Sequence, residues 1–140
     1  MLLKGGCSCA AVRYETEALP FHRTLCHCVD CRRAAGAPAV AWFTVPAAEL
    51  RWVRGCPAVH RSSPMVERGF CAACGTPLSY RNDGYAHEID ILACTLDEPG
   101  AASPQDHTFA SQRLGWMRVD DGLPVYPRSR GEGLQGNQKE

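Results

Sequence analysis

The sequence has no long hydrophobic run, and this absence excludes a membrane-spanning helix. Such a helix needs ~20 consecutive apolar residues, and no stretch of the chain approaches that length. The first residues, MLLKGGCSC, place only two leucines before a lysine and two glycines. This is far short of the apolar region of a secretory signal peptide. We therefore expect a cytoplasmic protein with no membrane partner.

The chain also has no excess of charge of either sign. Its 15 lysines and arginines balance 15 aspartates and glutamates, so the formal net charge is zero. Proteins that bind nucleic acid carry a basic surface that neutralises phosphates. The balance of charge gives no sign of such a surface, and we expect no nucleic-acid partner.

Large apolar residues become scarce near the end of the sequence. From Arg128 onward the segment RSRGEGLQGNQKE contains one of them, Leu134. Such a segment cannot bury enough apolar surface to pack against a core. The residues before it suffice for one domain but are too few for two. We expect a single domain over residues 1–127 and a polar, flexible tail over residues 128–140.

Cysteine, in contrast, is abundant, with nine in 140 residues. An odd number of cysteines in a reducing compartment is not typical of a disulfide framework, which favours metal binding. Cysteines one or two residues apart can reach a common metal, because the turn between them brings both sulfurs to one side. Seven of the nine fall into three such groups: Cys7 and Cys9; Cys26, Cys28 and Cys31; Cys71 and Cys74. The grouping predicts zinc, whereas the isolated Cys56 and Cys94 are expected to be small, buried apolar side chains.

Seven thiolates can be divided between two metals in more than one way. The economical division places Cys7, Cys9, Cys71 and Cys74 on one closed zinc and leaves Cys26, Cys28 and Cys31 on a second zinc with an open position. Another division groups Cys7, Cys9, Cys26 and Cys28 and leaves Cys31, Cys71 and Cys74 as the open set. Either way, one zinc is closed, as structural sites are, and one is open, as catalytic sites are.

Four segments occur in the order GGCSCAAVRY, CHCVDCRRAAGAPAVAWFTVP, SSPMVERGFCAACGTPLSY and IDILACTLDEP. They resemble the motifs of the glutathione-dependent formaldehyde-activating enzyme family, which includes the centromere protein V group. The resemblance runs from about Gly5 to Pro127. In its first motif the family commonly has glycine after the second cysteine, where this chain has Ala10.

This resemblance implies a β-tent fold of small antiparallel sheets stapled by zinc. It also implies two zinc ions per chain: a structural one on Cys7, Cys9, Cys71 and Cys74, and a catalytic one on Cys26, Cys28 and Cys31.

The pattern of apolar residues independently predicts a mainly β fold. In AAVRYET and in HEIDILACTL, apolar and charged residues alternate, which is typical of half-buried strands. AVAWFTV is a β-rich run that Pro46 ends. Short helical turns are expected only at Val29 to Ala35 and at Ala47 to Leu50.

An open zinc with three thiolate ligands suits a soft ligand such as a thiol. Three thiolates around one divalent cation leave a net charge of about minus one, which weakens the metal as a Lewis acid toward water. A small-molecule thiol–aldehyde adduct fits such a site. The resemblance implies a carbon–sulfur lyase acting on a glutathione-derived adduct such as S-hydroxymethylglutathione. The alternative is a non-catalytic, zinc-stabilised binding module, which has no use for an open metal position.

Four residues are candidate substrate contacts. Glutathione carries two carboxylates, and Arg32 and Arg33, which follow the cysteine triplet, could hold them through bidentate hydrogen bonds. Ser63 and Arg68 precede the last cysteine pair, in a segment that lies near the active site in the family. The competing interpretation of Arg32 and Arg33 is that they are exposed charges on a helical turn, and that of Ser63 is that it belongs to a turn. His27, between two ligands, is expected to point away from the metal.

Elemental analysis tests the assignment of the seven cysteines. Protein purified without chelator is expected to carry close to two zinc ions per chain, because the clustered thiolates supply one closed and one open site. A value near one would mean that the triplet does not hold metal, and a value of zero would contradict the zinc assignment.

Overall fold

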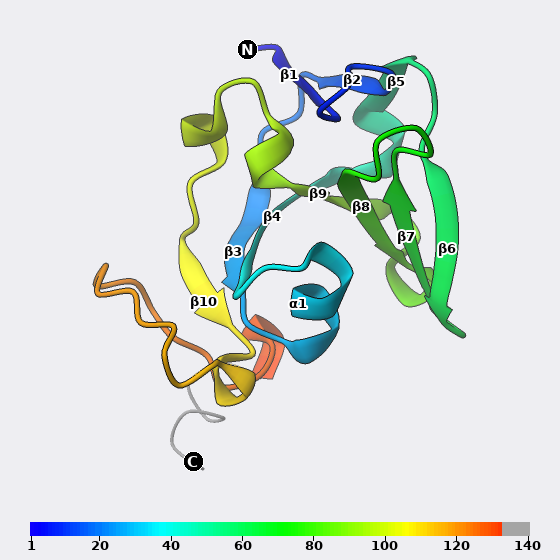
Figure 1. The fold of residues 1–140 in the computed structure, drawn as a ribbon. Helices are drawn as coiled ribbons and strands as arrows, with labels where there is room; N and C mark the ends of the chain where they lie inside the picture. Colours follow the sequence, from blue (N-terminus) through cyan, green and yellow to red (C-terminus); the bar gives the residue numbers. More distant parts are fainter. Residues whose placement is uncertain (133–140) are drawn as a thin grey trace. The chain divides into compact units, whose positions relative to one another are not determined.

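The structure is a computed structural model that describes residues 1–132, and within them the chain is mainly β, as the sequence predicts. It forms two compact units from interleaved segments (Figure 1). Among the described residues, unit 1 comprises Met1–Phe21 and Phe43–Ser103, and unit 2 comprises His22–Trp42 and residues 104–132. Strand β4, Val40–Pro46, passes from unit 2 into unit 1.

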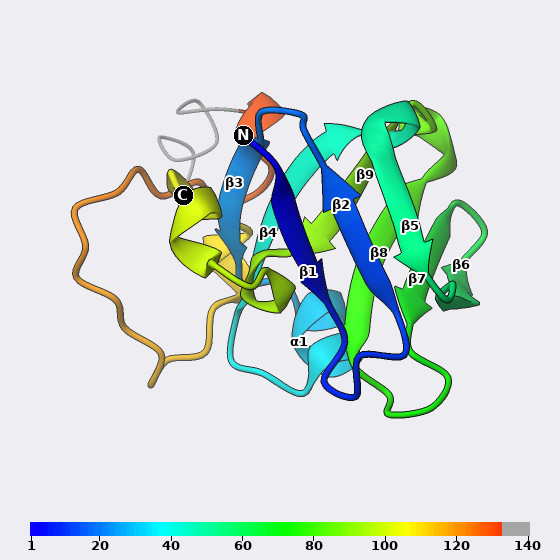
Figure 2. The ribbon, with the colours of Figure 1, turned by 90° about the horizontal axis from the view of Figure 1, so that it is seen from above.

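Unit 1 contains a three-stranded antiparallel sheet in the order β1-β2-β5. Figure 2 shows these strands side by side. Their bounds are Leu3–Gly6, Arg13–Thr16 and Leu50–Arg54. In β2, Tyr14 and Thr16 are buried whereas Arg13 and Glu15 are partly exposed, so the predicted alternation is confirmed.

A second run of antiparallel strands in unit 1 has the order β9-β8-β7-β6. The bounds of β6 to β9 are Ala58–Ser63, Val66–Phe70, Pro77–Asn82 and Glu88–Leu92. β9 buries Ile89 and Ile91, as the alternation predicts. The described residues also contain six 3-10 helices: Ala47–Glu49, Asp83–Tyr85, Ala93–Thr95, Pro99–Ala102, Ala110–Gln112 and Arg130–Glu132.

The core of unit 1 centres on Tyr14, which is fully buried. Its ring meets Trp52 edge to face, with centroids 5.8 Å apart, and its hydroxyl lies 2.8 Å from that of Thr95. A Cβ atom on Gly5 would lie 2.4 Å from the hydroxyl oxygen of Tyr14, so only glycine fits at this point of β1. This packing fixes the end of β1, from which Cys7 follows directly.

Unit 2 contains the one α-helix of the described residues, α1, at the predicted Val29–Ala35. Strands β3, Phe21–Cys26, and β10, Asp106–Thr108, pair in parallel. The expectation of antiparallel sheets is therefore incomplete. About 80 residues separate the two strands in sequence, which leaves ample chain for the crossover that a parallel pair requires.

The segment that begins at Arg128 makes specific contacts in its described part. Arg130 donates from Nε and Nη2 to the two carboxylate oxygens of Asp106, at 2.5 and 2.9 Å. Its Nη1 lies 2.9 Å from Nδ1 of His22. Asp106 is only 2% exposed, so Arg130 compensates the burial of that carboxylate. The remainder of the expected tail, residues 133–140, lies outside the described residues.

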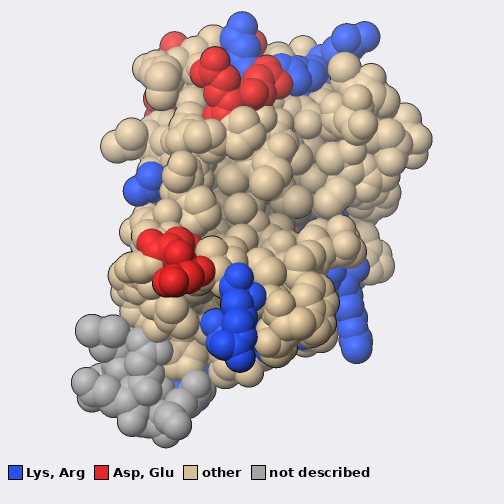
Figure 3. Space-filling view, turned by 60° about the vertical axis from the view of Figure 1, so that its left-hand side comes forward, with Lys and Arg blue, Asp and Glu red and all other residues tan. Residues whose placement is uncertain are grey.

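Charged side chains occupy a small part of the face shown in Figure 3. They form a few small groups on a largely uncharged surface, and at the top of the view acidic and basic groups adjoin each other. None of the helices in residues 1–132 is long and apolar enough to cross a membrane.

Replacing Arg130 with alanine is expected to lower the free energy of unfolding by about 1–3 kcal/mol, because the buried Asp106 loses its charged partner. Arg128→Ala is the matched control. Arg128 pairs with Glu132, and the two side chains are 46% and 50% exposed, so the expected change is below about 1 kcal/mol. Urea denaturation of the wild type and both variants measures the difference. Equal losses for the two arginines would contradict the role given to Asp106.

Candidate metal centres

Four sulfur atoms of unit 1 converge on one point. The Sγ atoms of Cys7, Cys9, Cys71 and Cys74 all lie within 4.8 Å of one another. Cys7 follows β1 and Cys71 follows β7, so two strand ends deliver the two halves of the cluster. Sγ of Cys9 lies 3.7 Å from that of Cys7 and 3.8 Å from that of Cys71. Zinc–sulfur bonds of about 2.3 Å set tetrahedral sulfur–sulfur separations of about 3.8 Å, so this spacing fits a closed zinc site.

The two turns that carry these cysteines are closed by backbone hydrogen bonds. Ala10 N–H donates to the carbonyl of Cys7, and Gly75 N–H donates to the carbonyl of Cys71. Ala10 and Gly75 each follow the last cysteine of their turn and have positive φ angles, 65° and 82°. Glycine adopts this conformation freely, whereas the Cβ of alanine makes it unfavourable by about 1–2 kcal/mol. Ala10 thus keeps the turn that glycine would form, with strain in the backbone.

The acid–base properties of the cluster favour a cation. The Thr76 hydroxyl, 3.2 Å from Sγ of Cys74, lowers the pKa of that thiol to about 5. At Cys9 the N–H of Ala11 favours the thiolate, but the neighbouring sulfurs, that of Cys74 first, outweigh it and raise the pKa to about 11. The four thiols cannot all ionise side by side unless a positive charge offsets their repulsion. The donor set therefore fits a divalent metal.

Three sulfur atoms of unit 2 form the second cluster. The Sγ atoms of Cys26, Cys28 and Cys31 lie within 4.8 Å of one another. Cys26 ends β3, Cys28 is the N-cap residue of α1, and Cys31 lies in its first turn. Sγ of Cys28 accepts a hydrogen bond from the N–H of Cys31 at 3.2 Å. The structure thus groups the clustered sulfurs four and three, in the division that the sequence favours.

Crowding also dominates the chemistry of the three-sulfur cluster. The sulfurs of Cys28 and Cys31, together with burial, raise the pKa of Cys26 far above that of an ordinary thiol. A soft divalent cation removes this penalty, because thiolate sulfur is a preferred ligand of zinc. Three protein ligands leave one of the four tetrahedral positions of zinc for another molecule. The residues present in both clusters therefore fit zinc, one closed and one open.

Of the two arginines that follow the cysteine triplet, both predicted to contact substrate, Arg32 is engaged within unit 2. Its Nε donates to the carbonyl of His27 at 3.3 Å and its Nη2 donates to the carbonyl of Gln112 at 3.2 Å. The side-chain Oε1 of Gln112 in turn accepts the N–H of Val29 at 2.9 Å. These hydrogen bonds with Gln112 connect the first turn of α1 to the segment after β10. Arg33, in contrast, is exposed.

The other two predicted substrate contacts belong to unit 1. Ser63 is exposed at the end of β6, opposite Val66. Arg68 lies on β7 with its guanidinium 5.1 Å from the ring centroid of Tyr80, which is a cation–π contact. Their role as substrate contacts stays a prediction.

His27 is not a member of the sulfur cluster. Its side chain is 1% exposed, and its Nε2 lies 2.9 Å from Nδ1 of His107. Nε2 of His107 lies 2.9 and 3.1 Å from the carboxylate oxygens of Asp121. Burial, reinforced by the neighbouring His107, lowers the pKa of His27 to about 4. Sequence reasoning missed this chain of residues, because 80 positions separate the two histidines and no local pattern connects them.

The expectation that Cys56 and Cys94 are buried is wrong, since both are exposed. Cys56 lies in the turn between β5 and β6. Cys94 lies in a 3-10 helix in which Ala93 is buried instead. A single 3-10 turn buries only one side, and the cysteine occupies the other.

Comparisons with known proteins agree with the resemblance seen in the motifs. Residues 2–112 match the family model described as glutathione-dependent formaldehyde-activating enzyme. A protein of Halomonas elongata, whose name assigns it provisionally as a glutathione-dependent formaldehyde-activating enzyme, is 27% identical over 133 residues. The match covers 86% of this chain and 82% of that relative.

A solved structure shares the fold. The crystal structure of a Rhodobacter sphaeroides protein superposes with a TM-score of 0.57 and 22% sequence identity. The similarity covers 87% of this chain and 98% of that protein.

A pair of opposite substitutions tests the backbone strain in the two cysteine turns. Ala10→Gly is expected to raise the free energy of unfolding of the zinc-loaded protein by up to about 1 kcal/mol, because it relieves the left-handed conformation. Gly75→Ala is expected to lower it by about 1–2 kcal/mol for the same reason. Nothing lies within 4 Å of the position where its Cβ would stand, so a clash cannot explain a loss. Denaturant titration measures both, and a loss with Ala10→Gly would contradict the strain.

Proposed function

Because this chain belongs to the glutathione-dependent formaldehyde-activating enzyme family, we propose that it is a zinc-dependent enzyme acting on a thiol–aldehyde adduct. The reaction proposed is of the carbon–sulfur lyase type, and S-hydroxymethylglutathione is the proposed substrate. The observation that carries this proposal is the three-sulfur cluster, whose donor set leaves one position of a tetrahedral zinc available. The name of the Halomonas relative supports the same activity.

The proposal gives the two clusters different roles, one structural and one catalytic. In the proposal, Cys7, Cys9, Cys71 and Cys74 hold a structural zinc, and Cys26, Cys28 and Cys31 hold the catalytic one. The first set saturates a tetrahedral ion and joins positions 62 residues apart, Cys9 and Cys71, which is the arrangement of a fold-stabilising metal. The second set spans six residues and does not saturate the ion.

The reaction needs little beyond binding and orientation. In the direction of adduct formation, the thiol sulfur attacks the carbonyl carbon, the carbon–sulfur bond forms, and the proton of the thiol passes to the carbonyl oxygen. The reverse reaction breaks the same bond and returns the proton to sulfur. Zinc held by the three thiolates would supply a position for the sulfur or oxygen of the adduct. The backbone around the cluster contributes by keeping the three sulfurs converged, through the hydrogen bond from Cys31 N–H to Cys28.

Recognition of glutathione requires cationic groups for its two carboxylates. Arg33 is exposed two residues after the cluster cysteine Cys31, and we assign it the bidentate contact with one carboxylate. Arg32 is the weaker candidate because two of its donors already bind backbone carbonyls. Ser63 and Arg68 remain proposed substrate contacts on the strength of the family resemblance of their segment. The proposal includes a cytoplasmic location, since a reducing compartment keeps the nine cysteines of the sequence out of disulfides.

Two cysteine-to-serine variants separate the roles of the two metals. Cys71→Ser is expected to strongly reduce the yield of soluble protein, because the structural zinc contributes about 10 kcal/mol of folding free energy. Cys28→Ser is expected to keep the fold and to lose or weaken one zinc, since a metal that closes a six-residue span constrains the unfolded chain little. It is also expected to abolish activity.

The measurements are zinc content, thermal stability and the rate of adduct exchange. Exchange between free formaldehyde and S-hydroxymethylglutathione is measured by NMR in an equilibrated mixture, against the rate without protein. If Cys28→Ser unfolds the chain as badly as Cys71→Ser, the triplet is structural and the proposal fails. A two-zinc wild type that does not accelerate exchange would favour a non-catalytic binding module.

A further inference from the structure

His27, the residue between Cys26 and Cys28, makes contacts within unit 2 through both its backbone and its side chain. His27 N–H donates to the carbonyl of Thr108 at 3.0 Å, and the carbonyl of His27 accepts from Arg32 at 3.3 Å. Its imidazole meets that of His107 edge to edge, with centroids 5.1 Å apart and an interplanar angle of 25°. Backbone and side chain of His27 are therefore both fixed by residues distant in sequence.

The hydrogen bonds among the side chains run in one direction. A carboxylate only accepts, so Nε2–H of His107 donates to Asp121. In a neutral His107 imidazole, Nδ1 is then left as an acceptor, and Nε2–H of His27 donates to it across 2.9 Å. Asp121 thus selects one tautomer of His107, which selects one tautomer and one ring orientation of His27.

This arrangement leaves one buried atom unsatisfied. Nδ1 of His27 is buried and has no hydrogen-bond partner within the part of the chain that the structure describes. An orphaned buried acceptor is unfavourable, and an apolar side chain of similar shape would avoid the loss. A histidine at this position is therefore explained by the one contact that it does make, from Nε2 to His107.

We propose that His107 and Asp121 are positioning residues for the three-sulfur cluster. By fixing the imidazole of His27 they fix the backbone that joins Cys26 to Cys28, so that these two sulfurs and that of Cys31 converge on one metal. The inference rests on the proposed function in one respect, namely that the cluster binds zinc. Outer contacts of this kind typically change metal affinity by about 10- to 100-fold.

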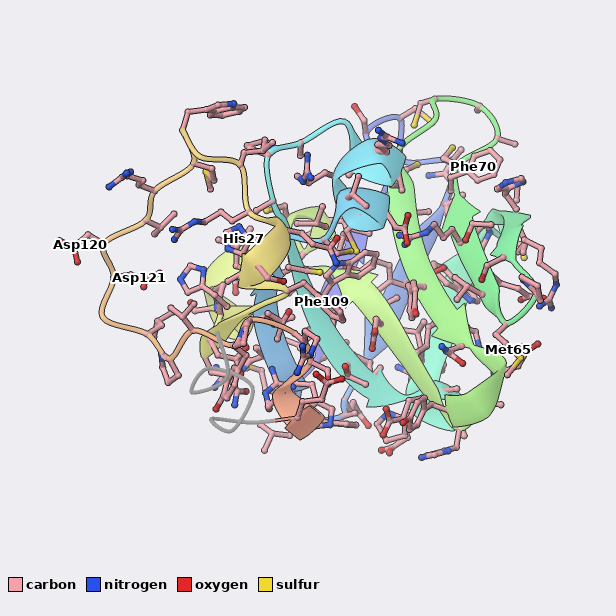
Figure 4. The ribbon with its side chains drawn as sticks, turned by 90° about the horizontal axis from the view of Figure 1, so that it is seen from below. His27, Met65, Phe70, Phe109, Asp120 and Asp121 are labelled. Atoms are coloured by element: carbon pink, nitrogen blue, oxygen red, sulfur yellow. The ribbon has the colours of Figure 1, made fainter. Side chains whose placement is uncertain are left out.

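Neighbouring residues in the loop supply a matched control. Figure 4 shows Asp120 and Asp121 adjacent in the loop that follows β10, with Asp121 on its inner side and Asp120 pointing outward. Both residues are exposed, and the carboxylate of Asp121 accepts a hydrogen bond from His107. Asp121→Ala is expected to weaken the second zinc, and Asp120→Ala is expected to leave it unchanged.

Substitutions of His107 distinguish positioning from packing. Asparagine places its amide near the position of Nδ1 and can still accept from His27, but it cannot reach Asp121. Glutamine places its amide near Nε2 and keeps Asp121 while losing His27. We expect His107→Ala and His107→Gln to lower the zinc affinity of the triplet about 10- to 100-fold, and His107→Asn to restore most of it.

The readout is competition for zinc against a chromophoric chelator, on the full-length chain, with thermal unfolding recorded in parallel. Cys28→Ser gives the reference curve for the four-sulfur cluster alone, which is an internal standard in every variant. The expected result is a loss confined to the second zinc, with the first held at wild-type affinity.

Several results would overturn the inference. Equal behaviour of the asparagine and glutamine variants would show that the contact with His27 is not what matters. Equal weakening of both zinc sites would show a general loss of stability. A wild type that binds one zinc would overturn this inference together with the proposed function. A wild type that binds two zinc ions but does not accelerate adduct exchange would overturn the proposed function alone.

Discussion

The mutual repulsion of crowded thiolates is the constraint on which the rest of this structure depends. Seven sulfurs are gathered in two groups, each within 4.8 Å. As neutral thiols they pack like small apolar groups, but as thiolates they repel one another unless a cation lies between them. Metal binding and the ionisation of the thiols are therefore one process, and its free energy is available to folding. In unit 1 this links the ends of β1 and β7, which are more than 60 positions apart.

The two clusters are supported in different ways. The four-sulfur cluster rests on two short turns with their own backbone hydrogen bonds. The three-sulfur cluster lies in a single segment, and the residues that hold this segment are distant in sequence. Gln112 accepts a hydrogen bond from the first turn of α1, and His107 contacts His27. A saturated ion itself enforces the geometry of its ligands. An ion with an open position would enforce less, so the contacts from Gln112 and His107 would supply more of the rigidity at the three-sulfur cluster.

Much of the fold and of the metal centres could be predicted from local sequence. Cysteines one or two positions apart predict shared metals, and alternation of apolar residues predicts β2 and β9, because both signals reside in neighbouring residues. The parallel pairing of β3 with β10 and the contacts of Arg32 depend on residues about 80 positions away. No local pattern encodes them. Cys56 and Cys94 show the same limit, because their exposure depends on which side of a turn faces the core.

The interleaving of the units has a consequence for synthesis. The triplet segment ends at Cys31, whereas its partner His107 is added about 80 residues after His27. At the usual ribosomal rate of about 5–20 residues per second, this interval lasts on the order of 4–16 seconds. Throughout it, the three thiols of the triplet are outside the ribosome without the strand whose residues later hold His27 between them. During this period metal ions and oxidants can reach the cysteines of a segment that is not yet held in its final geometry.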